Sequence, residues 1–238
     1  MKTPFTRRAL LSSGLTAAAL LPLKTSLRAD TTQLAEVCTL LPEQDLGPYY
    51  LADELVRSDI REGKSGVPLD LRLLVLDARN CQPLRGAAVD LWHCDAAGAY
   101  SGFGASVGET HRFLRGIQLT DQNGLAKFQT IFPGCYPGRT NHIHFKLRTA
   151  GARDGNTYRG GHVAHTGQVF FPEEITAGLM RQGAYAQHQG ARTRPDEDWI
   201  FRRQDGQAST ARLSPAVPED PTRGFEAVLV AAVDISNG

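Results

Sequence analysis

The sequence Leu69-Asp-Leu-Arg-Leu-Leu-Val-Leu-Asp77 decides the fold class, because its apolar residues alternate with polar ones over the first half of the run. In a β-strand successive side chains point to opposite faces of the sheet. The odd-numbered apolar residues would therefore share one buried face, while Asp70 and Arg72 would lie on the other. This alternation predicts a half-buried strand rather than a helix.

Short runs of the same kind recur along the chain, with turn residues between them. One of the turns is Asp121-Gln-Asn-Gly124. Because Asn and Gly accept the positive φ of a tight turn, we expect a β-hairpin there. The expected strands are residues 69–77, 87–94, 113–120, 125–131, 142–149, 168–171, 199–202 and 225–234. About eight short strands without intervening helices predict an all-β fold, an antiparallel β-sandwich.

Three stretches depart from the strand pattern. Residues 173–187 follow Pro172 and carry two acidic residues in their first turn, which predicts one short surface helix. Residues 150–164 and 203–224 are rich in Gly, Arg, Pro and Thr, so we expect long loops that shape an entrance.

The first 29 residues have the pattern of an export signal, because Arg7 and Arg8 precede an apolar run too short for a confident membrane span. The arginine pair resembles a twin-arginine signal, which predicts a periplasmic or secreted protein with no membrane association beyond export. An ordinary signal and an uncleaved anchor are the alternatives. Residues 30–67 lack a sustained period and predict an extended arm before a single catalytic domain over 68–238.

The composition fits one well-buried domain plus appendages, with 238 residues of which 41% are hydrophobic and 21% charged. The formal net charge of +1 gives no clustered basic face, so no nucleic-acid partner is expected. Four cysteines in an exported protein predict disulfides. Of the three connectivities we favour Cys38 with Cys81 and Cys94 with Cys135, because the second pair flanks segments expected to meet at one site.

The segment Cys135-Tyr-Pro-Gly-Arg-Thr-Asn-His-Ile-His-Phe145 brings a phenol, a guanidinium and a His-x-His pair together. On a strand, His142 and His144 share one face while Ile143 points into the core. Two imidazoles presented together can bind a transition metal, and imidazole suits Zn, Cu, Fe and Ni alike. The pair therefore predicts a metal site without identifying the metal.

Several motifs together resemble one known family, the intradiol ring-cleavage dioxygenases of the catechol and protocatechuate dioxygenase type. Besides the segment above, they are Gly47-Pro-Tyr-Tyr50, Asp90-Leu-Trp-His-Cys-Asp-Ala-Ala-Gly-Ala-Tyr100, Leu119-Thr-Asp-Gln-Asn-Gly124 and His165-Thr-Gly-Gln-Val-Phe-Phe171. The resemblance covers most of residues 38–172. It implies an Fe(III) enzyme that uses O2 to open a small aromatic diol between its hydroxyls, giving a cis,cis-muconate-type diacid.

Carried over residue by residue, the resemblance makes Tyr100, Tyr136, His142 and His144 the ligands of one Fe(III) ion. The inorganic chemistry agrees with this ligand set. Two phenolates and one hydroxide neutralise Fe(III), and such hard anionic donors favour the ferric state over the ferrous state.

The resemblance also assigns catalytic and substrate-binding residues. Tyr136 would leave the metal when the substrate binds and take up one of its protons. Arg139 matches an arginine that stabilises negative charge on the substrate ring. Gln168 matches a glutamine that lines the pocket, and we expect Tyr49 to lie beside the same pocket.

Some alternatives stay open at this point. The interval from Tyr136 to His142 is shorter than in the catechol and protocatechuate enzymes, so the ring substituents of the substrate cannot be carried over. A different strand-histidine metal enzyme would need a nearby carboxylate, and no acid occurs between Phe145 and Ala152. A non-catalytic β-sandwich binding module could use the same tyrosines and histidines as a recognition surface. The sequence does not decide whether the protein forms a homo-oligomer.

Overall fold

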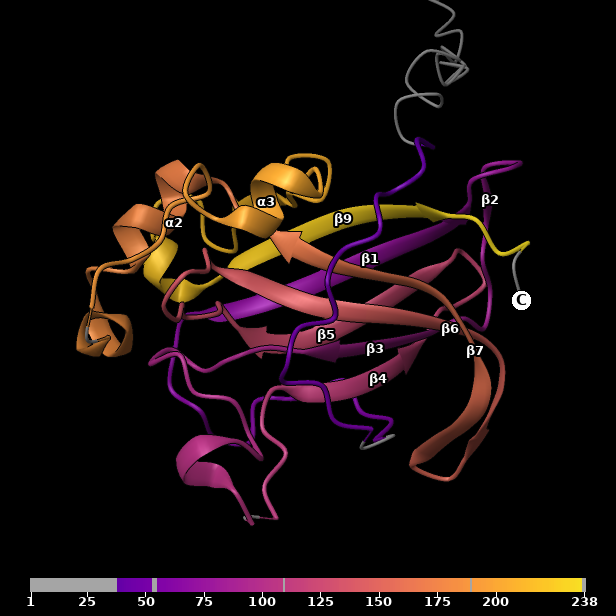
Figure 1. The fold of residues 1–238 in the computed structure, drawn as a ribbon, viewed down its shortest axis with the longest axis horizontal. Helices are drawn as coiled ribbons and strands as arrows, with labels where there is room; N and C mark the ends of the chain where they lie inside the picture. Colours follow the sequence, from indigo (N-terminus) through magenta and orange to yellow (C-terminus); the bar gives the residue numbers. More distant parts are fainter. Residues whose placement is uncertain (1–37, 53–54, 109, 189, 237–238) are drawn as a thin grey trace, which may run out of the picture.

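The computed structural model describes residues 38–52, 55–108, 110–188 and 190–236. They form two β-sheets packed face to face, with short helices gathered at one end (Figure 1). The predicted export signal at 1–29 and the first residues of the arm lie outside the described residues. Within the described part of the chain, no helix is both long enough and apolar enough to cross a membrane.

The first sheet, sheet A, has five strands. They are β1 (Pro68–Asp77), β2 (Gln82–Pro83), β5 (Leu125–Ile131), β8 (Arg212–Pro215) and β9 (Phe225–Val233). Strand β1 pairs antiparallel with β2 and β5 and parallel with β9, and β8 pairs antiparallel with β9. The sandwich is therefore antiparallel except for the β1–β9 pair. Strand β8 lies within residues 203–224, where we had expected only a loop.

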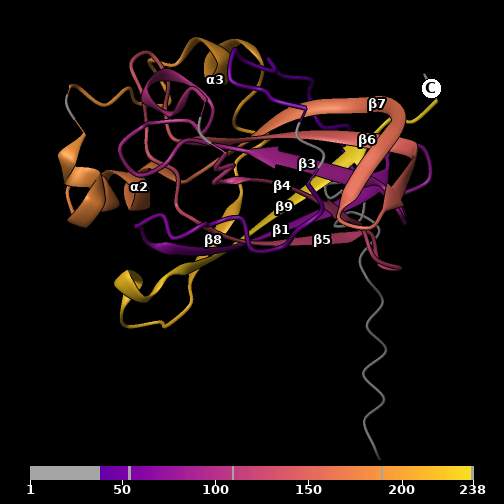
Figure 2. The same cartoon turned by 90° about the horizontal axis from the view of Figure 1, so that it is seen from below.

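The second sheet, sheet B, has four antiparallel strands in the order β4-β3-β6-β7. They are β4 (Arg115–Leu119), β3 (Ala88–Trp92), β6 (His142–Asp154) and β7 (Thr157–Phe170). Figure 2 shows this sheet as one layer and sheet A as the other. The predicted all-β sandwich is confirmed.

Apolar side chains from both sheets meet between the two layers. Leu71 and Leu73 of β1 are fully buried there, in one cluster with Leu91 of β3 and Phe145 of β6. Complete burial of one such side chain stabilises the fold by about 1.5–3 kcal/mol. The alternation that predicted a strand at Leu69–Asp77 therefore also identifies its core face correctly.

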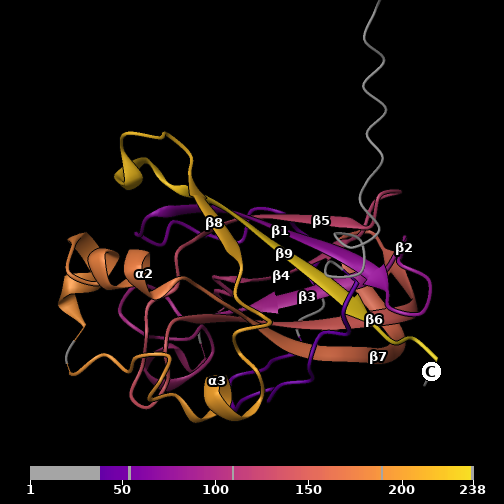
Figure 3. The ribbon, with the colours of Figure 1, turned by 90° about the horizontal axis from the view of Figure 1, so that it is seen from above.

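The helices gather at one end of the sandwich, opposite the C-terminal end (Figure 3). They are α2 (Glu173–Leu179), α3 (Trp199–Arg203) and three 3-10 turns, Gly104–Ser106, Gly183–Gln187 and Pro221–Arg223. The helix expected over 173–187 is divided, because Gln182 takes an extended conformation with φ −124° and ψ 150°. The strand expected at 199–202 is wrong. Asp198 caps α3 by accepting from the N–H groups of Ile200 at 2.8 Å and Phe201 at 3.2 Å, which overrides the strand propensity of these residues.

The hairpin expected around Asp121–Gly124 is also wrong. The tight turn is present, because the Asp121 carboxylate accepts from the N–H groups of Asn123 at 2.8 Å and Leu125 at 2.9 Å. However, β4 before the turn pairs with β3 of sheet B, whereas β5 after it pairs with β1 of sheet A. Turn chemistry specifies a reversal of direction but does not specify which strands pair.

Residues 150–164, expected to be a loop, instead extend β6 and β7 into a long hairpin. The glycines in this stretch mark close approaches between paired strands. A Cβ on Gly151 would lie 2.5 Å from the ring of Tyr158, and one on Gly161 would lie 2.4 Å from the carbonyl oxygen of Thr149. These glycines therefore allow close packing within a sheet and do not indicate an irregular segment.

The segment before β1 runs along the sandwich and makes isolated bridges to both sheets. A disulfide joins Cys38 in this segment to Cys81 beyond β1, as predicted. The second predicted disulfide is wrong, because Cys94 and Cys135 are buried free thiols. Burial raises the pKa of both thiols, which disfavours the thiolate that disulfide formation requires.

Candidate metal centre and active site

The two histidines of β6 lie at the start of the strand, on the outer face of sheet B. His144 pairs in register with Trp92 of β3 on one side and with Gln168 of β7 on the other. Ile143 between the histidines is part of the core between the sheets. The alternation of the strand therefore directs both imidazoles away from the core and toward the same point.

The ring nitrogens of these histidines are close together. His142 Nε2 lies 3.0 Å from His144 Nε2 and 3.2 Å from the hydroxyl oxygen of Tyr136. His142 Nδ1 lies 2.6 Å from the carbonyl oxygen of Thr140, and because a carbonyl can only accept, Nδ1 carries the proton and Nε2 a lone pair. Burial, followed by the positive charge of Arg139, holds the pKa of both histidines well below the usual range. Both imidazoles are therefore neutral at neutral pH.

A tight loop after β3 positions Tyr100. The carboxylate of Asp95 accepts from two backbone N–H groups of this loop, at 3.0 and 2.9 Å. Gly98 has a φ of 91°, and a Cβ there would lie 2.3 Å from the carbonyl oxygen of Cys135. Only glycine permits this approach, which brings the rings of Tyr100 and Tyr136 to 5.7 Å between centroids.

The two phenols lie in surroundings that oppose ionisation. Burial raises the pKa of Tyr100 well above its usual value and that of Tyr136 to about 12, while the charge of Arg139 acts in the opposite direction on both. Among the described residues, the buried Tyr100 hydroxyl has no hydrogen-bond partner of ordinary geometry. A cation at the point where the phenols and imidazoles meet would offset the cost of forming phenolates.

The donor set fits a metal ion. Bonds of about 2.0–2.2 Å to nitrogen and oxygen ligands place neighbouring donor atoms about 3 Å apart. The separations of 3.0 and 3.2 Å around His142 Nε2 match this spacing. Two phenols and two neutral imidazoles suit a hard, highly charged ion better than a soft one. Across the residues described, no group of three or more His, Cys, Asp or Glu could hold a metal, so a metal bound here would need the tyrosines as ligands beside the histidines.

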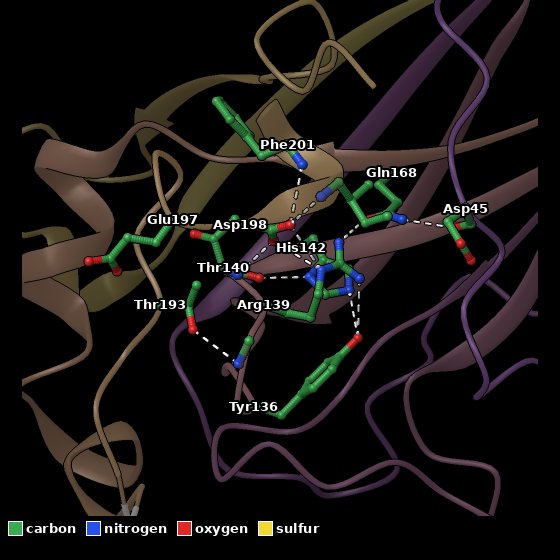
Figure 4. A network of polar contacts seen from close by, with 12 residues as sticks. Asp45, Tyr136, Arg139, Thr140, His142, Gln168, Thr193, Glu197, Asp198 and Phe201 are labelled. Carbon is green, nitrogen blue, oxygen red and sulfur yellow. Dashed lines mark hydrogen bonds and ion pairs between the residues drawn. The ribbon is translucent and has the colours of Figure 1, made fainter. Parts of the chain in front are cut away.

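The guanidinium of Arg139 is held on several sides (Figure 4). Its Nε donates to the two carboxylate oxygens of Asp198, at 3.2 and 3.0 Å. Its Nη2 donates to the side-chain oxygen of Gln168, and its Nη1 lies 3.5 Å from the hydroxyl of Tyr136. Gln168 in turn donates from Nε2 to the carbonyl of Asp45 at 2.8 Å. A fixed cation therefore faces the phenol and the histidines.

Aromatic rings form the remaining wall. Tyr49, from the N-terminal arm, stacks on Tyr100 with ring centroids 4.4 Å apart and lies edge-on to Tyr136 at 5.5 Å. On the other side, Trp92 stacks on His144 with the ring planes only 3° apart. Flat apolar surfaces beside a fixed cation can accommodate a planar aromatic ligand that bears negative charge.

Comparison with known proteins identifies the family. The family model described as Dioxygenase matches residues 46–177, a stretch that contains both tyrosines, both histidines and Arg139. The solved intradiol ring-cleavage dioxygenase from Tetranychus urticae is 34% identical with a TM-score of 0.73, and the match covers 83% of this chain and 95% of that one. This chain belongs to the intradiol ring-cleavage dioxygenase family.

Other members of the family match more distantly. The protocatechuate 3,4-dioxygenase beta chain of Burkholderia cepacia is 35% identical over 122 residues, which cover 44% of this chain and 48% of that protein. This chain thus spans about half the length of the curated relatives it matches. The dioxygenase domain of a dioxygenase carbohydrate-binding protein fusion from Streptomyces sp. SirexAA-E is 29% identical with a TM-score of 0.57, covering 83% of this chain and all (100%) of that one.

In this intradiol dioxygenase fold, the side chains selected from the sequence lie together. Tyr136 contacts His142, His142 contacts His144, and Arg139 contacts Gln168, while Tyr49 lies against Tyr100. Their roles as iron ligands, catalytic residues and substrate contacts stay predictions.

Two contributors to the site were missed by the sequence analysis. Asp45 binds Gln168 through its backbone carbonyl, while its carboxylate accepts from the N–H of Gly47, so the side chain gives no signal of the contact with Gln168. Asp198 stands directly before Trp199-Ile-Phe201, and an Asp in that place is a helix N-cap signal that could have excluded a strand.

Proposed function

We propose that this protein is a non-haem Fe(III)-dependent intradiol dioxygenase, which uses O2 to cleave a catechol-type ring between its two hydroxyls and yields a cis,cis-muconate-type diacid. The observation that carries the proposal is the meeting of two phenols and two imidazoles, with His142 Nε2 at 3.0 Å from His144 Nε2, beside Arg139. Family membership supports it, because intradiol dioxygenases use non-haem iron.

The proposed iron ligands are Tyr100, Tyr136, His142 and His144. When bound, Fe(III) acts as a Lewis acid that holds the diol in its deprotonated form and makes its ring reactive toward O2. Tyr100 and both histidines are almost completely buried, whereas Tyr136 is partly exposed. This difference makes Tyr136 the ligand best placed to give way to a substrate.

Tyr136 is also the group best suited to accept a proton from the substrate. Burial raises the pKa of its hydroxyl to about 12, so a Tyr136 phenolate without a cation beside it would be a strong base. Arg139 Nη1, 3.5 Å from the same oxygen, favours the anion while it exists. The pair can therefore take up one hydroxyl proton as the diol binds.

The remaining residues hold and stabilise the ring. The guanidinium of Arg139 is positioned to stabilise negative charge that develops on the ring, and its bond to Gln168 limits its movement. The ring of Tyr49, stacked on Tyr100, provides an apolar surface on the arm side of the site. Stacking against such a surface would orient a planar substrate.

The central test is oxygen uptake by the iron-loaded protein against a panel of substituted catechols, with products identified by mass spectrometry. We expect a ring-opened diacid that carries both atoms of labelled O2, and a coloured protein, because phenolate bound to Fe(III) absorbs visible light. A colourless protein without oxygen uptake would indicate a different metal enzyme or a binding module.

Two variants separate the roles of the site. His142→Ala should lose both colour and turnover, whereas Arg139→Ala should keep the colour and lose about 10²–10³-fold in rate. The control is His162→Ala, on the β6–β7 hairpin, whose ring contacts Thr149 away from the site. Oxygen uptake at the wild-type rate by His142→Ala would refute the ligand assignment.

We also propose that the protein works after export, in the periplasm or outside the cell. The twin-arginine-like signal supports this proposal, as does the Cys38–Cys81 disulfide, since disulfides persist in oxidising compartments. Fractionation of cells that carry Arg7→Lys together with Arg8→Lys tests it. We expect this variant to remain in the cytoplasm, and its appearance outside would argue against the twin-arginine route.

A further inference from the structure

We propose that Asp198 is a positioning residue that sets the geometry of both Arg139 and His142; the inference rests on the function proposed above. Asp198 is fully buried, with 0% of its surface exposed. It lies outside the region matched by the family model, in the segment that leads into α3.

The two carboxylate oxygens of Asp198 share Arg139 Nε, at 3.2 and 3.0 Å, and otherwise have different partners (Figure 4). One oxygen, Oδ1, accepts from the N–H groups of Ile200 at 2.8 Å and Phe201 at 3.2 Å, which caps the helix. The other, Oδ2, accepts from Arg139 Nε at 3.0 Å and from the backbone N–H of Thr140 at 2.9 Å. Every partner is a donor, so both ends of the side chain must be acceptors.

Helix capping alone does not explain this arrangement. A serine caps a helix about as well as an aspartate, and it avoids burying a charge, which is costly unless the charge is paired. An asparagine would place an NH2 group against the donors on one of the two sides. The requirement for a carboxylate therefore comes from the side that faces Arg139 and Thr140.

Through these contacts, Asp198 constrains two neighbours of the proposed metal centre. The bond to Nε fixes the plane of the guanidinium of Arg139, which directs Nη1 toward Tyr136 and Nη2 toward Gln168. The bond to the N–H of Thr140 holds the backbone of this residue in place, and the carbonyl of the same residue accepts from His142 Nδ1 at 2.6 Å. That acceptor keeps the lone pair of His142 on Nε2, where a metal would bind.

The test compares Asp198→Ser with wild type and with a matched control. Serine retains the cap of α3 but cannot reach Arg139 with two oxygens. We expect kcat to fall about 10–100-fold while KM changes by less than about threefold, because Arg139 is proposed to act on charge that develops during the reaction. The control is Asp196→Ser, since Asp196 is exposed and, within the described residues, forms its ion pair with Arg194. This variant should keep the wild-type kcat.

A double-mutant cycle separates positioning from a general loss of structure. If Asp198 acts through Arg139, adding Asp198→Ser to Arg139→Ala should lower kcat by less than about threefold. If the losses in kcat of the two single variants multiply fully in the double variant, the proposed action of Asp198 through Arg139 is overturned. So would an Asp198→Ser protein with wild-type kcat.

A readout on iron-free protein keeps the inference separate from the proposed function. In ¹⁵N-labelled protein, the Nε–H of Arg139 should give a slowly exchanging signal near neutral pH, assigned by its absence from Arg139→Ala. The signal should persist in Asp196→Ser and vanish in Asp198→Ser, or in Asp198→Asn if the serine variant does not fold. If the signal persists without the carboxylate, the inference is overturned. If the wild-type protein shows the signal but does not cleave a catechol ring, only the proposed function is refuted.

Discussion

Over residues 142–148, both faces of β6 are buried, but they differ in what buries them. Ile143 and Phe145 point inward and pack in the core between the sheets. His142, His144 and Lys146 point outward, where they contact aromatic rings from the loop with Tyr136, from β3 and from the arm, respectively. Sheet B therefore has one buried face that stabilises the fold and one that holds the proposed active site, and burial alone does not distinguish the two.

The polar outer face can be buried because the arm supplies partners for it. Tyr50 donates from its hydroxyl to Asp90 at 2.9 Å, and its ring lies under the amino group of Lys146 at 3.5 Å. Gly47 lies against His144, since a Cβ there would be 3.0 Å from His144 Cε1. The difference between the faces therefore depends on a segment that belongs to neither sheet.

The largest effects should come from shortening one side chain on each face. His144→Ala should abolish ring cleavage, by more than about 10³-fold, yet change the free energy of unfolding by less than about 2 kcal/mol. Phe145→Ala should cost about 3–5 kcal/mol, because it leaves a cavity in the core. Chemical denaturation and oxygen uptake measure both variants. An active His144→Ala protein, or a Phe145→Ala protein of wild-type stability, would contradict the assignment of activity to the outer face of β6 and of stability to its inner face.

The second largest effect should come from removing the disulfide that anchors the arm, because the arm covers the outer face of sheet B. The Cys38–Cys81 disulfide closes a sequence separation of 43 residues, and its loss in Cys38→Ser should cost about 4 kcal/mol of unfolding free energy. Reductant should bring the wild type to the same stability and leave the variant unchanged. If the reduced wild type is as stable as the oxidised protein, the arm stays packed on the sandwich without the disulfide.

The pH dependence of stability should report the buried acid on the outer face. Burial raises the pKa of Asp90 to about 6 from 3.8, with Tyr50, Lys146 and Arg148 opposing the shift. The folded state therefore holds this proton more tightly than the unfolded chain, so the stabilisation is present below pH 4 and is lost as pH rises through about 6.

Asp90→Asn should remove this effect. Its unfolding free energy relative to wild type should rise by about 3 kcal/mol between pH 3.5 and pH 7, at about 1.4 kcal/mol per pKa unit. Denaturation at several pH values measures the difference. The control is Asp59→Asn, since the pKa of the exposed Asp59 is lowered by Arg61 and its pH trend should have the opposite sign. A flat difference for Asp90→Asn would contradict the burial argument.

The smallest effect concerns the contact between the arm and the imidazole. Gly47→Ala and Gly63→Ala both place an L residue at a positive φ, 68° and 75° respectively. Each substitution should lower the free energy of unfolding by about 1–2 kcal/mol. Only at Gly47 would the new methyl group press on His144, whereas Gly63 has no atom within 4 Å of its Cβ position. We expect weaker iron binding for Gly47→Ala alone, measured by titration of the visible absorption with Fe(III). If both variants bind iron with equal affinity, the arm does not constrain His144.

The sequence was informative where side chains repeat with a fixed period. The alternation at Leu69–Asp77 and around Ile143 identified core faces correctly, and the motifs around Tyr100 and Tyr136 selected side chains that the fold brings together. Strand pairing was harder, because Asp121–Gly124 makes the same turn whether the strands beside it pair or separate into two sheets.

Long-range contacts were the other limit. Nothing local to Cys94 or Cys135 shows that both thiols stay buried and unpaired. The carboxylate of Asp198 reaches Arg139 across a separation of 59 residues, and no local pattern encodes such a contact. The segment at Trp199–Arg203 was misassigned because its apolar residues favour a strand, whereas the residue before them starts a helix.

The parallel pairing of β1 with β9 affects how the chain can fold. Strand β1 needs Phe225–Val233 as its neighbour, although nearly the whole sandwich sequence separates the two. Such distant pairing gives a high contact order, which slows folding. A chain interrupted before Phe225 would leave one hydrogen-bonding edge of β1 open to other molecules and prone to aggregation. Completion of sheet A must therefore wait until β9 has been synthesised, which makes truncated products the forms most in need of a chaperone.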